Sequence, residues 1–307
     1  MVDRRSLELK DAIGIIPNLG KDETWEFARE LIEWLKPRGF EVYMPSCAGM
    51  AFGAGCQAVP VDRWRDRVRF AIVLGGDGTL LGAARALAPS GIPILGVNLG
   101  HFGFLTELET SNVFEHLPAF LSGDFIEDER LMLSAAVIRK GEVVYSGRAL
   151  NEACVARGHY GRLTVLSMRV SGKDVDAYEG DGIIISTPTG STAYSLSAGG
   201  PIVAPEIDAF LVTPICPHTL YSRSVMVPGS ETCEIEVVLP SQSTMLSLDG
   251  QEFYSLEKND MIMIRKSEFK VMLLRRKGWS FYDVLRKKMK EGGARLPQGD
   301  AGLSAKP

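Results

Sequence analysis

Residues 68–79 read Val-Arg-Phe-Ala-Ile-Val-Leu-Gly-Gly-Asp-Gly-Thr, an apolar run that ends in a glycine-rich turn. The apolar run predicts a buried strand, and residues 79–87 have helical character. Three glycines at such a junction remove side chains, so backbone N–H groups and the helix N-terminus can approach an anion. The sequence therefore predicts a phosphate-binding loop made of Gly75, Gly76, Gly78 and Thr79.

Strands and helices alternate around this loop. Residues 12–16, 40–43 and 92–97 predict further strands, and residues 22–36 place apolar side chains at helical spacing. This alternation is typical of an open, Rossmann-like parallel sheet of the α/β class, with its ligand at the strand ends. From residue 131 the pattern changes to short β-branched runs, which predict a β-rich second part of β-sandwich type. These runs lie at 135–138, 143–145, 163–170, 183–186, 233–239 and 261–264.

The composition excludes several classes of protein and of partner. Of the 307 residues, 45% are hydrophobic and 23% charged, the balance of a soluble globular protein. A net charge of −4 argues against nucleic acid as the main partner. The five cysteines contain no C-x-x-C pair, so neither a disulfide framework nor a zinc site is expected. No secretory leader or membrane-spanning run is evident, so we expect a cytoplasmic protein without a membrane partner.

Asp77 stands among the glycines of the loop. A carboxylate there would repel phosphate unless it had a task, such as accepting a proton from a sugar hydroxyl or helping to hold Mg²⁺. Both tasks suit phosphoryl transfer. The alternative is a tight strand-to-helix turn in which Asp77 and Thr79 cap the helix. The two commonest phosphate-loop patterns, GxxxxGK followed by Ser or Thr and GxGxxG after a strand, are both absent.

Further motifs follow along most of the chain. They are Asn151-Glu152, Asp181-Gly182 and Ser186-Thr-Pro-Thr-Gly-Ser-Thr-Ala-Tyr-Ser-Leu-Ser-Ala-Gly-Gly-Pro201, with Gly100-His-Phe-Gly-Phe-Leu-Thr106, Pro214-Ile-Cys-Pro-His-Thr-Leu220, Leu248-Asp-Gly-Gln251 and Trp279-Ser-Phe-Tyr-Asp-Val-Leu-Arg286. Together with GGDGT at 75–79 they resemble the motifs of the bacterial NAD kinases, in the same order. GGDGT alone is shared with lipid kinases, whereas the long motif at 186–201 is specific.

The resemblance implies an activity. Members of this family transfer the γ-phosphoryl of ATP, or in some cases of inorganic polyphosphate, to the 2′-hydroxyl of the adenosine ribose of NAD, giving NADP. The resemblance makes Asp77 the ribose-contacting residue and the base, a role worth roughly 10²- to 10⁴-fold in rate. Mg²⁺ is expected to arrive with ATP rather than at a protein metal site. The family also implies a homodimer or homotetramer.

The resemblance further implies which residues bind NAD. They are Asp77, Gly78, Phe104, Asn151, Glu152, Asp181, Thr189, Thr192, Ala193, Tyr194, Ser197 and Gln251, with Asp249 as a further candidate. Some have an alternative interpretation, because Phe104 and Tyr194 could be core aromatics and Asn151-Glu152 could be a turn between strands. The charged Glu179, two residues before Asp181, favours NAD over NADH.

The remaining polar residues are interpreted as structural. The four histidines show no metal-ligand spacing, so no metal site on the protein is expected. The basic runs 275–277 and 286–288 could attract ATP phosphates, although a solvated helix face is the preferred interpretation.

Residues 270–275 predict a last strand and residues 281–290 a short helix. In the family the final strand and helix return to the first domain. We therefore expect a discontinuous Rossmann-like domain of residues 1–129 and 270–290, which carries the GGDGT loop. Residues 130–269 would form the β-rich, dinucleotide-binding domain. Residues 291–307 are polar and rich in glycine, which predicts a disordered tail.

Two other functions share parts of this pattern. A lipid kinase of the diacylglycerol type would share GGDGT, but has no reason to carry Asn151-Glu152 with the 186–201 motif. A nucleotide-binding protein without turnover would be expected to lack the acid of GGDGT, and Asp77 is present.

Overall fold

The structure is a computed structural model that describes residues 12–52, 55–100, 103–158, 163–218, 222–241 and 243–291. Residues up to Lys277 form one compact unit, and a second unit begins at Gly278. The second unit contains the helix α7 (Phe281–Glu291), which confirms the helix predicted at 281–290. The predicted tail after residue 291 lies outside the described residues, and the docking of α7 on the first domain stays a prediction.

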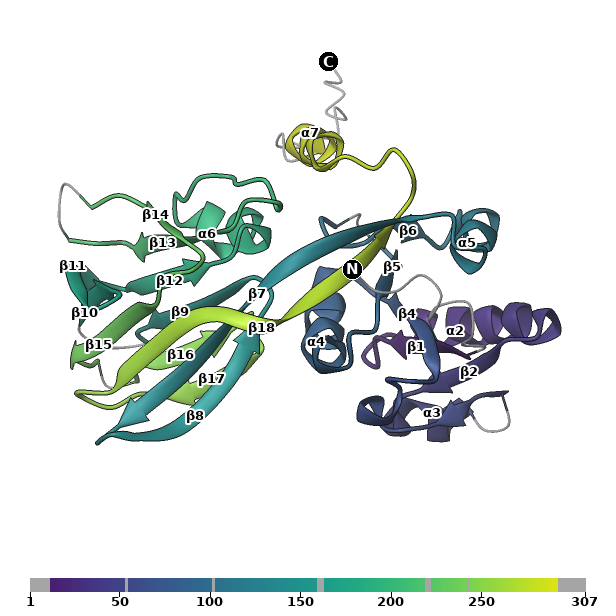
Figure 1. Ribbon diagram of the computed structural model, residues 1–307, viewed down its shortest axis with the longest axis horizontal. Coiled ribbons are helices and arrows are strands. Elements are labelled where there is room, and N and C mark those ends of the chain that lie inside the picture. Colours follow the sequence, from purple (N-terminus) through teal and green to yellow (C-terminus); the bar gives the residue numbers. More distant parts are fainter. Residues whose placement is uncertain are drawn as a thin grey trace, which may run out of the picture. The chain divides into compact units, whose positions relative to one another are not determined.

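A parallel sheet occupies the N-terminal part of the first unit (Figure 1). Its strands are β1 (Ala12–Pro17), β2 (Glu41–Met44), β3 (Gln57–Ala58), β4 (Val68–Leu74), β5 (Ile94–Asn98) and β6 (Leu108–Glu109). The order β5-β4-β1-β2-β3 places later strands on both sides of β1, so the strand order reverses between β1 and β4. Open parallel sheets bind ligands at such a reversal, outside the carboxyl ends of the strands.

Helices cover both faces of this sheet. They are α2 (Asp22–Leu35), α3 (Ser46–Phe52), α4 (Asp77–Leu87) and α5 (Val113–Leu121). Successive side chains of a strand point to opposite faces. Ile13, Ile15 and Ile72 therefore join one core with α2 and α5, whereas Ala71 and Val73 join a second core with α4. Because both faces are covered, the strands are nearly continuous apolar runs, and this is why they could be predicted.

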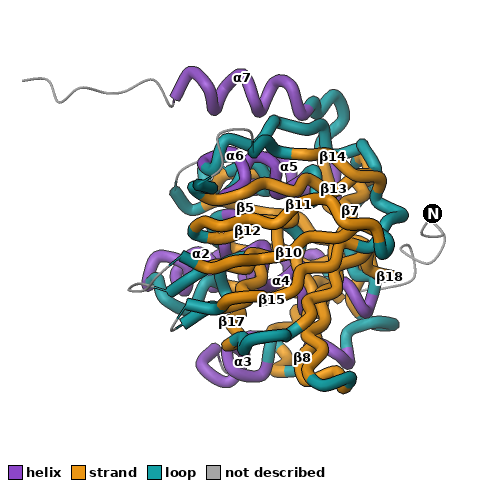
Figure 2. The backbone as a smooth tube through the Cα atoms, turned by 90° about the vertical axis from the view of Figure 1, so that its left-hand side faces the viewer, coloured by secondary structure: helices purple, strands orange, loops and turns teal. Residues whose placement is uncertain are grey.

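The β-rich part consists of two facing sheets, and strands make up most of it (Figure 2). One sheet is entirely antiparallel and contains β9 (Glu152–Ala156), β12 (Gly182–Ser186), β13 (Ala209–Ile215), β14 (Val225–Pro228), β16 (Met245–Leu248) and β17 (Glu252–Ser255). The other contains β7 (Ile126–Arg139), β8 (Glu142–Ala149), β10 (Thr164–Val170), β11 (Lys173–Gly180), β15 (Cys233–Leu239) and β18 (Met261–Arg275), and is continuous with the parallel sheet. Side chains of both sheets share one hydrophobic core, including Leu133, Ile235, Ile185 and Leu246. The predicted fold class is confirmed.

Strand β18 differs from the prediction. The sequence predicts separate strands at 261–264 and 270–275, but Met261–Arg275 is one strand of 15 residues. It pairs with β7 along its length, with a register shift between Lys266 and Lys270, and Leu273 pairs in parallel with Ile94 of β5. The irregular residues between Lys266 and Lys270 interrupt the apolar pattern, so the two pieces look separate in the sequence.

The predicted domain boundaries, 129/130 and 269/270, fall inside β7 and β18 respectively. The division into two domains stays a prediction. No helix in the described part of the chain is long and apolar enough to cross a membrane.

Candidate functional site

The glycine-rich loop begins where β4 ends and leads directly into α4 (Figure 1). Gly75 has a φ of +155°, and a Cβ atom there would lie 2.4 Å from Thr79 Oγ1, so this turn requires glycine. Asn18 Nδ2 donates a hydrogen bond to Thr79 Oγ1 at 3.1 Å. Because Asn18 follows β1, this contact fixes the loop at the point where the strand order reverses.

A cavity of about 600 Å³ lies beside the loop. Gly76, Gly78 and Thr79 line it together with Asn18, Lys21 and Gln251. Three of the four predicted phosphate-loop residues thus share one cavity, whereas Gly75 is buried. The ammonium of Lys21 and the positive end of the α4 dipole both favour phosphate at this place.

The carboxylate of Asp77 is held by a second loop. The backbone N–H groups of Phe104 and Leu105 donate to its two oxygens at 2.8 and 3.1 Å. A Cβ atom on Gly103 would lie 1.9 Å from Asp77 Oδ1, so glycine is required for this close approach. The capping alternative is wrong, because Gly76 is the N-cap of α4 and the Asp77 side chain bonds to another segment.

Arg275 holds the same segment from its other side. Its guanidinium is completely buried and donates to the carbonyl oxygens of Leu105 at 3.0 Å, Thr106 at 3.2 Å and Phe104 at 3.3 Å. The interpretation of Arg275 as part of a solvated helix face is therefore wrong. Burial of an arginine requires acceptors for its donors, and the loop carbonyls supply them.

Asp249 organises the Asn151-Glu152 turn. Its carboxylate accepts hydrogen bonds from the backbone N–H groups of Leu150 at 3.1 Å, Asn151 at 2.8 Å and Glu152 at 3.2 Å. The side chain of Glu152 is only 7% exposed, and its Oε2 has no hydrogen-bond partner among the described residues. Burial, with the nearby charge of Asp249, raises the pKa of Glu152 to about 8. An unsatisfied carboxyl group of this kind is a candidate ligand contact.

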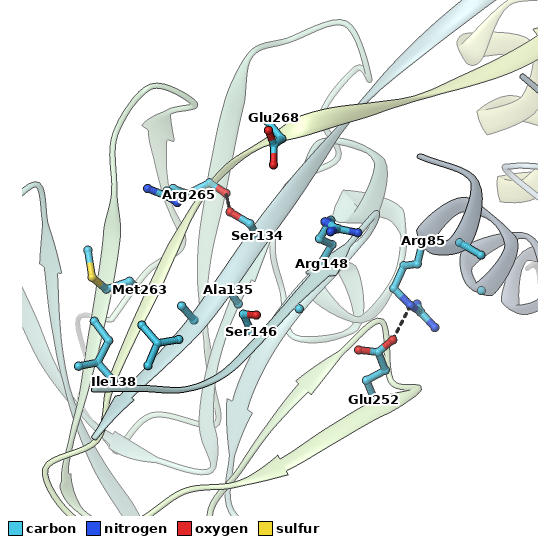
Figure 3. Close-up of a pocket in the computed structure, with 15 residues that line it drawn as sticks. Arg85, Ser134, Ala135, Ile138, Ser146, Arg148, Glu252, Met263, Arg265 and Glu268 are labelled. Atoms are coloured by element: carbon cyan, nitrogen blue, oxygen red, sulfur yellow. Dashed lines mark hydrogen bonds and ion pairs between the residues drawn. The ribbon is translucent and has the colours of Figure 1, made fainter. Parts of the chain in front are cut away.

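Arg85 is a further site residue, which no motif in the sequence marks. It lies on α4, eight residues after Asp77, and donates to Asp249 at 2.8 Å, Gln251 at 2.5 Å and Glu252 at 3.1 Å. Figure 3 shows Arg85 pointing at Glu252, beside a second cavity of about 790 Å³. Gln251 in turn donates from Nε2 to the carbonyl of Gly78 at 2.7 Å. The turn at 248–251 therefore joins the GGDGT loop to the Asn151-Glu152 turn.

The 186–201 motif packs against that turn. Thr187 N–H donates to the carbonyl of Asn151 at 2.8 Å, and a Cβ atom on Gly190 would lie 2.2 Å from the same carbonyl oxygen. Thr189 opens a short 3-10 helix (Thr189–Thr192), and its Oγ1 accepts from Arg130 at 3.3 Å. Ser191 is buried and bonds to Pro188 and Val203, which is a structural role.

The rest of the motif is more accessible. Thr192 and Ala193 are half-buried, and Ser197 is exposed, near the end of the short helix α6 (Tyr194–Ser197). Tyr194 is 45% exposed, so the core-tyrosine alternative is wrong. Partial burial, and then the charges of Cys154, Cys216, Asp181 and Glu152, raise the pKa of Tyr194. Asp181 itself accepts from Arg157 Nε at 2.5 Å.

The structure thus joins part of the predicted site by hydrogen bonds. Asp77 is hydrogen-bonded to Phe104, and a second set joins Gly78, Gln251, Asp249, Asn151 and Glu152 directly or through Arg85; the two sets meet where Asp77 and Gly78 are adjacent in the chain. Within the described ranges, neither Asp181 nor Tyr194 hydrogen-bonds to the GGDGT loop. Phe104 is half-buried and is therefore not a fully buried core aromatic.

Metal ligands do not gather in the described residues, where no three His, Cys, Asp or Glu side chains are placed to hold an ion. Of the four histidines, His101 and His159 lie outside the described residues.

Known proteins resemble this chain along most of its length. Residues 13–125 match the ATP-NAD kinase N-terminal domain, and residues 150–276 match the ATP-NAD kinase C-terminal domain. The NAD kinase of Caldanaerobacter subterraneus subsp. tengcongensis is 41% identical over 279 residues, which cover 91% of this chain and 99% of that protein. The NAD kinase of Moorella thermoacetica is 39% identical over 295 residues, covering 96% and 94%.

Two solved structures share the fold. The NAD kinase from Archaeoglobus fulgidus in complex with ATP has a TM-score of 0.70 at 25% identity, covering 92% of this chain and 99% of that one. Yeast NADH kinase complexed with NADH has a TM-score of 0.83 at 24% identity, covering 94% and 90%, and that likeness concerns the fold alone. Because both domains of the family match and the identity reaches 41% over most of the chain, the protein belongs to the NAD kinase family.

Proposed function

We propose that this chain transfers the γ-phosphoryl of ATP to the 2′-hydroxyl of the adenosine ribose of NAD and so makes NADP. One observation carries the proposal beyond family membership. The turn at 248–251 bonds to Gly78 of the GGDGT loop through Gln251, and to the Asn151-Glu152 turn through Asp249. The residues proposed for phosphate and for dinucleotide are thereby held against one another.

Asp77 acts as the base in this proposal. A carboxylate has about four lone-pair sites, and the N–H groups of Phe104 and Leu105 use two of them. The two bonds orient the side chain and leave acceptor capacity for a ribose hydroxyl. A positioned base of this type contributes roughly 10²- to 10⁴-fold to the rate. The base takes the hydroxyl proton as the ribose oxygen attacks the γ-phosphorus and ADP leaves.

The donor occupies the cavity beside the loop. The α4 N-terminus, Lys21 and the backbone at Gly76 and Gly78 provide the positive potential that phosphates require. In this proposal Mg²⁺ enters as the ATP complex. When bound, Mg²⁺ neutralises phosphate charge; the Thr79 hydroxyl and the Asp77 carboxylate are the nearby oxygen donors of the loop. The Archaeoglobus fulgidus relative, solved with ATP, supports this choice of donor.

The dinucleotide lies along the second set of residues. Glu152 and Asn151 offer a carboxyl and an amide to ribose hydroxyls and base edges, and the half-exposed Tyr194 offers an aromatic face. Asp181, Thr189, Thr192, Ala193 and Ser197 complete the proposed set. Glu179 favours NAD over NADH as the acceptor.

The assembly is proposed to be a cytoplasmic homodimer or homotetramer. Size-exclusion chromatography with light scattering measures this directly, and a monomer at micromolar concentration would contradict it.

The test of function mixes the purified protein with NAD, ATP and Mg²⁺ and reads NADP through an NADP-specific dehydrogenase. Parallel arms replace NAD by NADH, ATP by polyphosphate, and NAD by a diacylglycerol dispersion. We expect NADP in the first arm. A folded protein that phosphorylates only the lipid would be a lipid kinase, and one that binds nucleotides without any product would be a binding protein; either result refutes the proposal.

A further inference from the structure

Three buried charged side chains join two separate parts of the proposed site. Asp128 and Arg130 lie on β7, and Arg275 lies on the paired strand β18. Asp128 accepts from Arg275 Nε at 2.9 Å and from Arg130 Nε and Nη2 at 2.7 and 2.6 Å. We call Arg275, Asp128 and Arg130 the buried clamp. Their side chains are at most 9% exposed.

One arm of the clamp reaches Asp77. Arg275 donates to the carbonyl oxygens of Phe104 and Leu105, and the N–H groups of these two residues donate to the Asp77 carboxylate. The peptide units at 104–105 are therefore held between a guanidinium and the proposed base. A displacement of Arg275 displaces the donors that orient Asp77.

The other arm reaches the 186–201 motif. Arg130 Nη1 donates to Thr189 Oγ1 at 3.3 Å, within a buried environment. The same stretch of chain packs against Asn151, since Thr187 N–H donates to the Asn151 carbonyl at 2.8 Å. Placement of Thr189 therefore also affects the turn that carries Glu152.

Stability alone is a weak reason for such a cluster, because replacing buried ion pairs with apolar residues is often neutral or stabilising. Burial alone would raise the pKa of Asp128, but the hydrogen bonds and charges of Arg130 and Arg275 hold it below its usual range. The carboxylate stays ionised and keeps both arginines oriented. Hydrogen bonds of fixed geometry set the distance between the 104–105 segment and Thr189 more narrowly than an apolar contact would.

We propose that Arg275, Asp128 and Arg130 are positioning residues that set where Asp77 lies relative to Thr189, and so align the proposed base with the bound dinucleotide. The inference rests on the proposed function for the roles of the two ends. Misplacement of a reacting group by about 1 Å can cost roughly 100-fold in rate. The clamp therefore acts mainly on kcat.

The kinetic test is a double-variant cycle. Arg130→Gln should lower kcat at least tenfold, and Thr189→Val, which removes the accepting hydroxyl, should lower kcat similarly. In the Arg130→Gln protein, Thr189→Val should have no further effect on kcat. Effects that multiply would show that Arg130 and Thr189 act independently, and effects confined to KM for NAD would show that Thr189 serves binding alone; either result would overturn the proposal.

The matched control is Lys270→Gln. Lys270 and Glu129 form an exposed ion pair at 2.6 Å on the same two strands as the clamp. Loss of this pair removes a charge between β7 and β18 but touches neither the 104–105 segment nor the 186–201 motif. Its kcat should equal that of the unaltered protein.

A second measurement is independent of turnover. Hydrogen exchange on the full chain should be at least tenfold faster at the Phe104 and Leu105 amides in Arg130→Gln, or in Asp128→Asn if Arg130→Gln does not fold, after correction for global stability. Unchanged exchange at these amides would overturn the inference. An unaltered protein that makes no NADP would instead refute the proposed function, and the exchange result would still decide whether the clamp holds the Asp77 loop.

Discussion

The guanidinium of Arg85 lies 2.8 Å from the carboxylate of Asp249, although the two residues are 164 positions apart in the chain. Arg85 belongs to the helix that begins at Asp77, and Asp249 accepts the backbone N–H groups of the Asn151-Glu152 turn. The side chain of Arg85 is 13% exposed and that of Asp249 is completely buried. This one ion pair thus connects the helix of the proposed base to the turn proposed to bind NAD.

Removing Arg85 should destabilise the protein. Arg85→Met leaves the buried Asp249 carboxylate without its cation, and breaking such a pair costs about 3 to 5 kcal/mol. Urea unfolding of Arg85→Met, Asp249→Asn and the double variant measures the effect. We expect the double variant to lose clearly less free energy of unfolding than the two single variants lose in sum. Additive effects, or a loss below about 0.5 kcal/mol for Arg85→Met, would mean that the pair has little energetic importance.

Gly103→Ala should disturb the proposed base without unfolding the chain. The new Cβ atom would lie 1.9 Å from Asp77 Oδ1, so the carboxylate must move away from the Phe104 and Leu105 N–H groups. We expect kcat to fall about 100-fold, the scale for a misplaced reacting group. Gly100→Ala is the matched control, because a Cβ atom on Gly100 meets nothing within 4 Å. Equal kcat values for the two variants would contradict the assigned role of this contact.

Asp77→Asn should separate binding from turnover. The amide keeps the size of the side chain but cannot accept a proton from the ribose hydroxyl, so kcat should fall by roughly 10²- to 10⁴-fold. The amide nitrogen cannot accept the second of the two backbone N–H bonds to this side chain, so thermal unfolding should stay cooperative with a lower Tm, and calorimetric NAD binding should remain measurable. A near-normal kcat would remove Asp77 from the role of base.

Glu152 should make stability depend on pH. Burial, assisted by the Asp249 charge, raises the pKa of Glu152 from 4.5 to about 8. Between these two values the unfolded chain has lost the proton and the folded chain keeps it, so this group's stabilisation is complete below pH 4.5 and is lost as the pH rises to about 8. Glu152→Gln is neutral at every pH and should lack this loss. Its Tm relative to the unaltered protein should therefore increase from pH 5 to pH 9.

The same variant tests binding. At pH 7 the protonated Glu152 carboxyl and a glutamine amide offer the same types of hydrogen-bonding group, so KM for NAD should be near normal. The kcat/KM profile of the unaltered protein should change near pH 8, and that change should be absent in Glu152→Gln. Tm curves of the two proteins that run parallel across this range would show that Glu152 is already ionised in the fold.

The longer strands β1, β2, β4 and β5 of the parallel sheet could be predicted from the sequence because they are largely buried, whereas the two-residue strands β3 and β6 were missed. β4 is apolar except for Arg69, and β5 is apolar up to Asn98, whereas β11 was missed because most of its residues are exposed and several are charged. Helix α5 was missed because Pro118 interrupts its pattern. A strand that is buried on one or both faces has an apolar or alternating pattern that can be seen in the sequence. An exposed edge strand has little such pattern.

The residues of the candidate site also divide into those that a local sequence motif marks and those that it does not. The GGDGT loop could be predicted because its glycines and carboxylate are adjacent in the chain, and Asn151 and Glu152 were found through the resemblance. Arg85 and Arg275 were not, because their partners are 147 to 171 positions away. Arg275 also stands beside Arg276 and Lys277, and nothing in a basic run tells which member is buried.

The single strand β18 also has a consequence for biosynthesis. Leu273 pairs with Ile94 of β5, and Leu274 belongs to the core that α2 and α5 cover. A growing chain must therefore carry the early parallel sheet with the edge of β5 paired only to the two-residue strand β6 until nearly all of the described residues have left the ribosome. Unpaired edges with apolar flanks are the surfaces that aggregate and that chaperones bind. Translation stalls before residue 271 should thus be far more harmful to this protein than the short length of the missing segment implies.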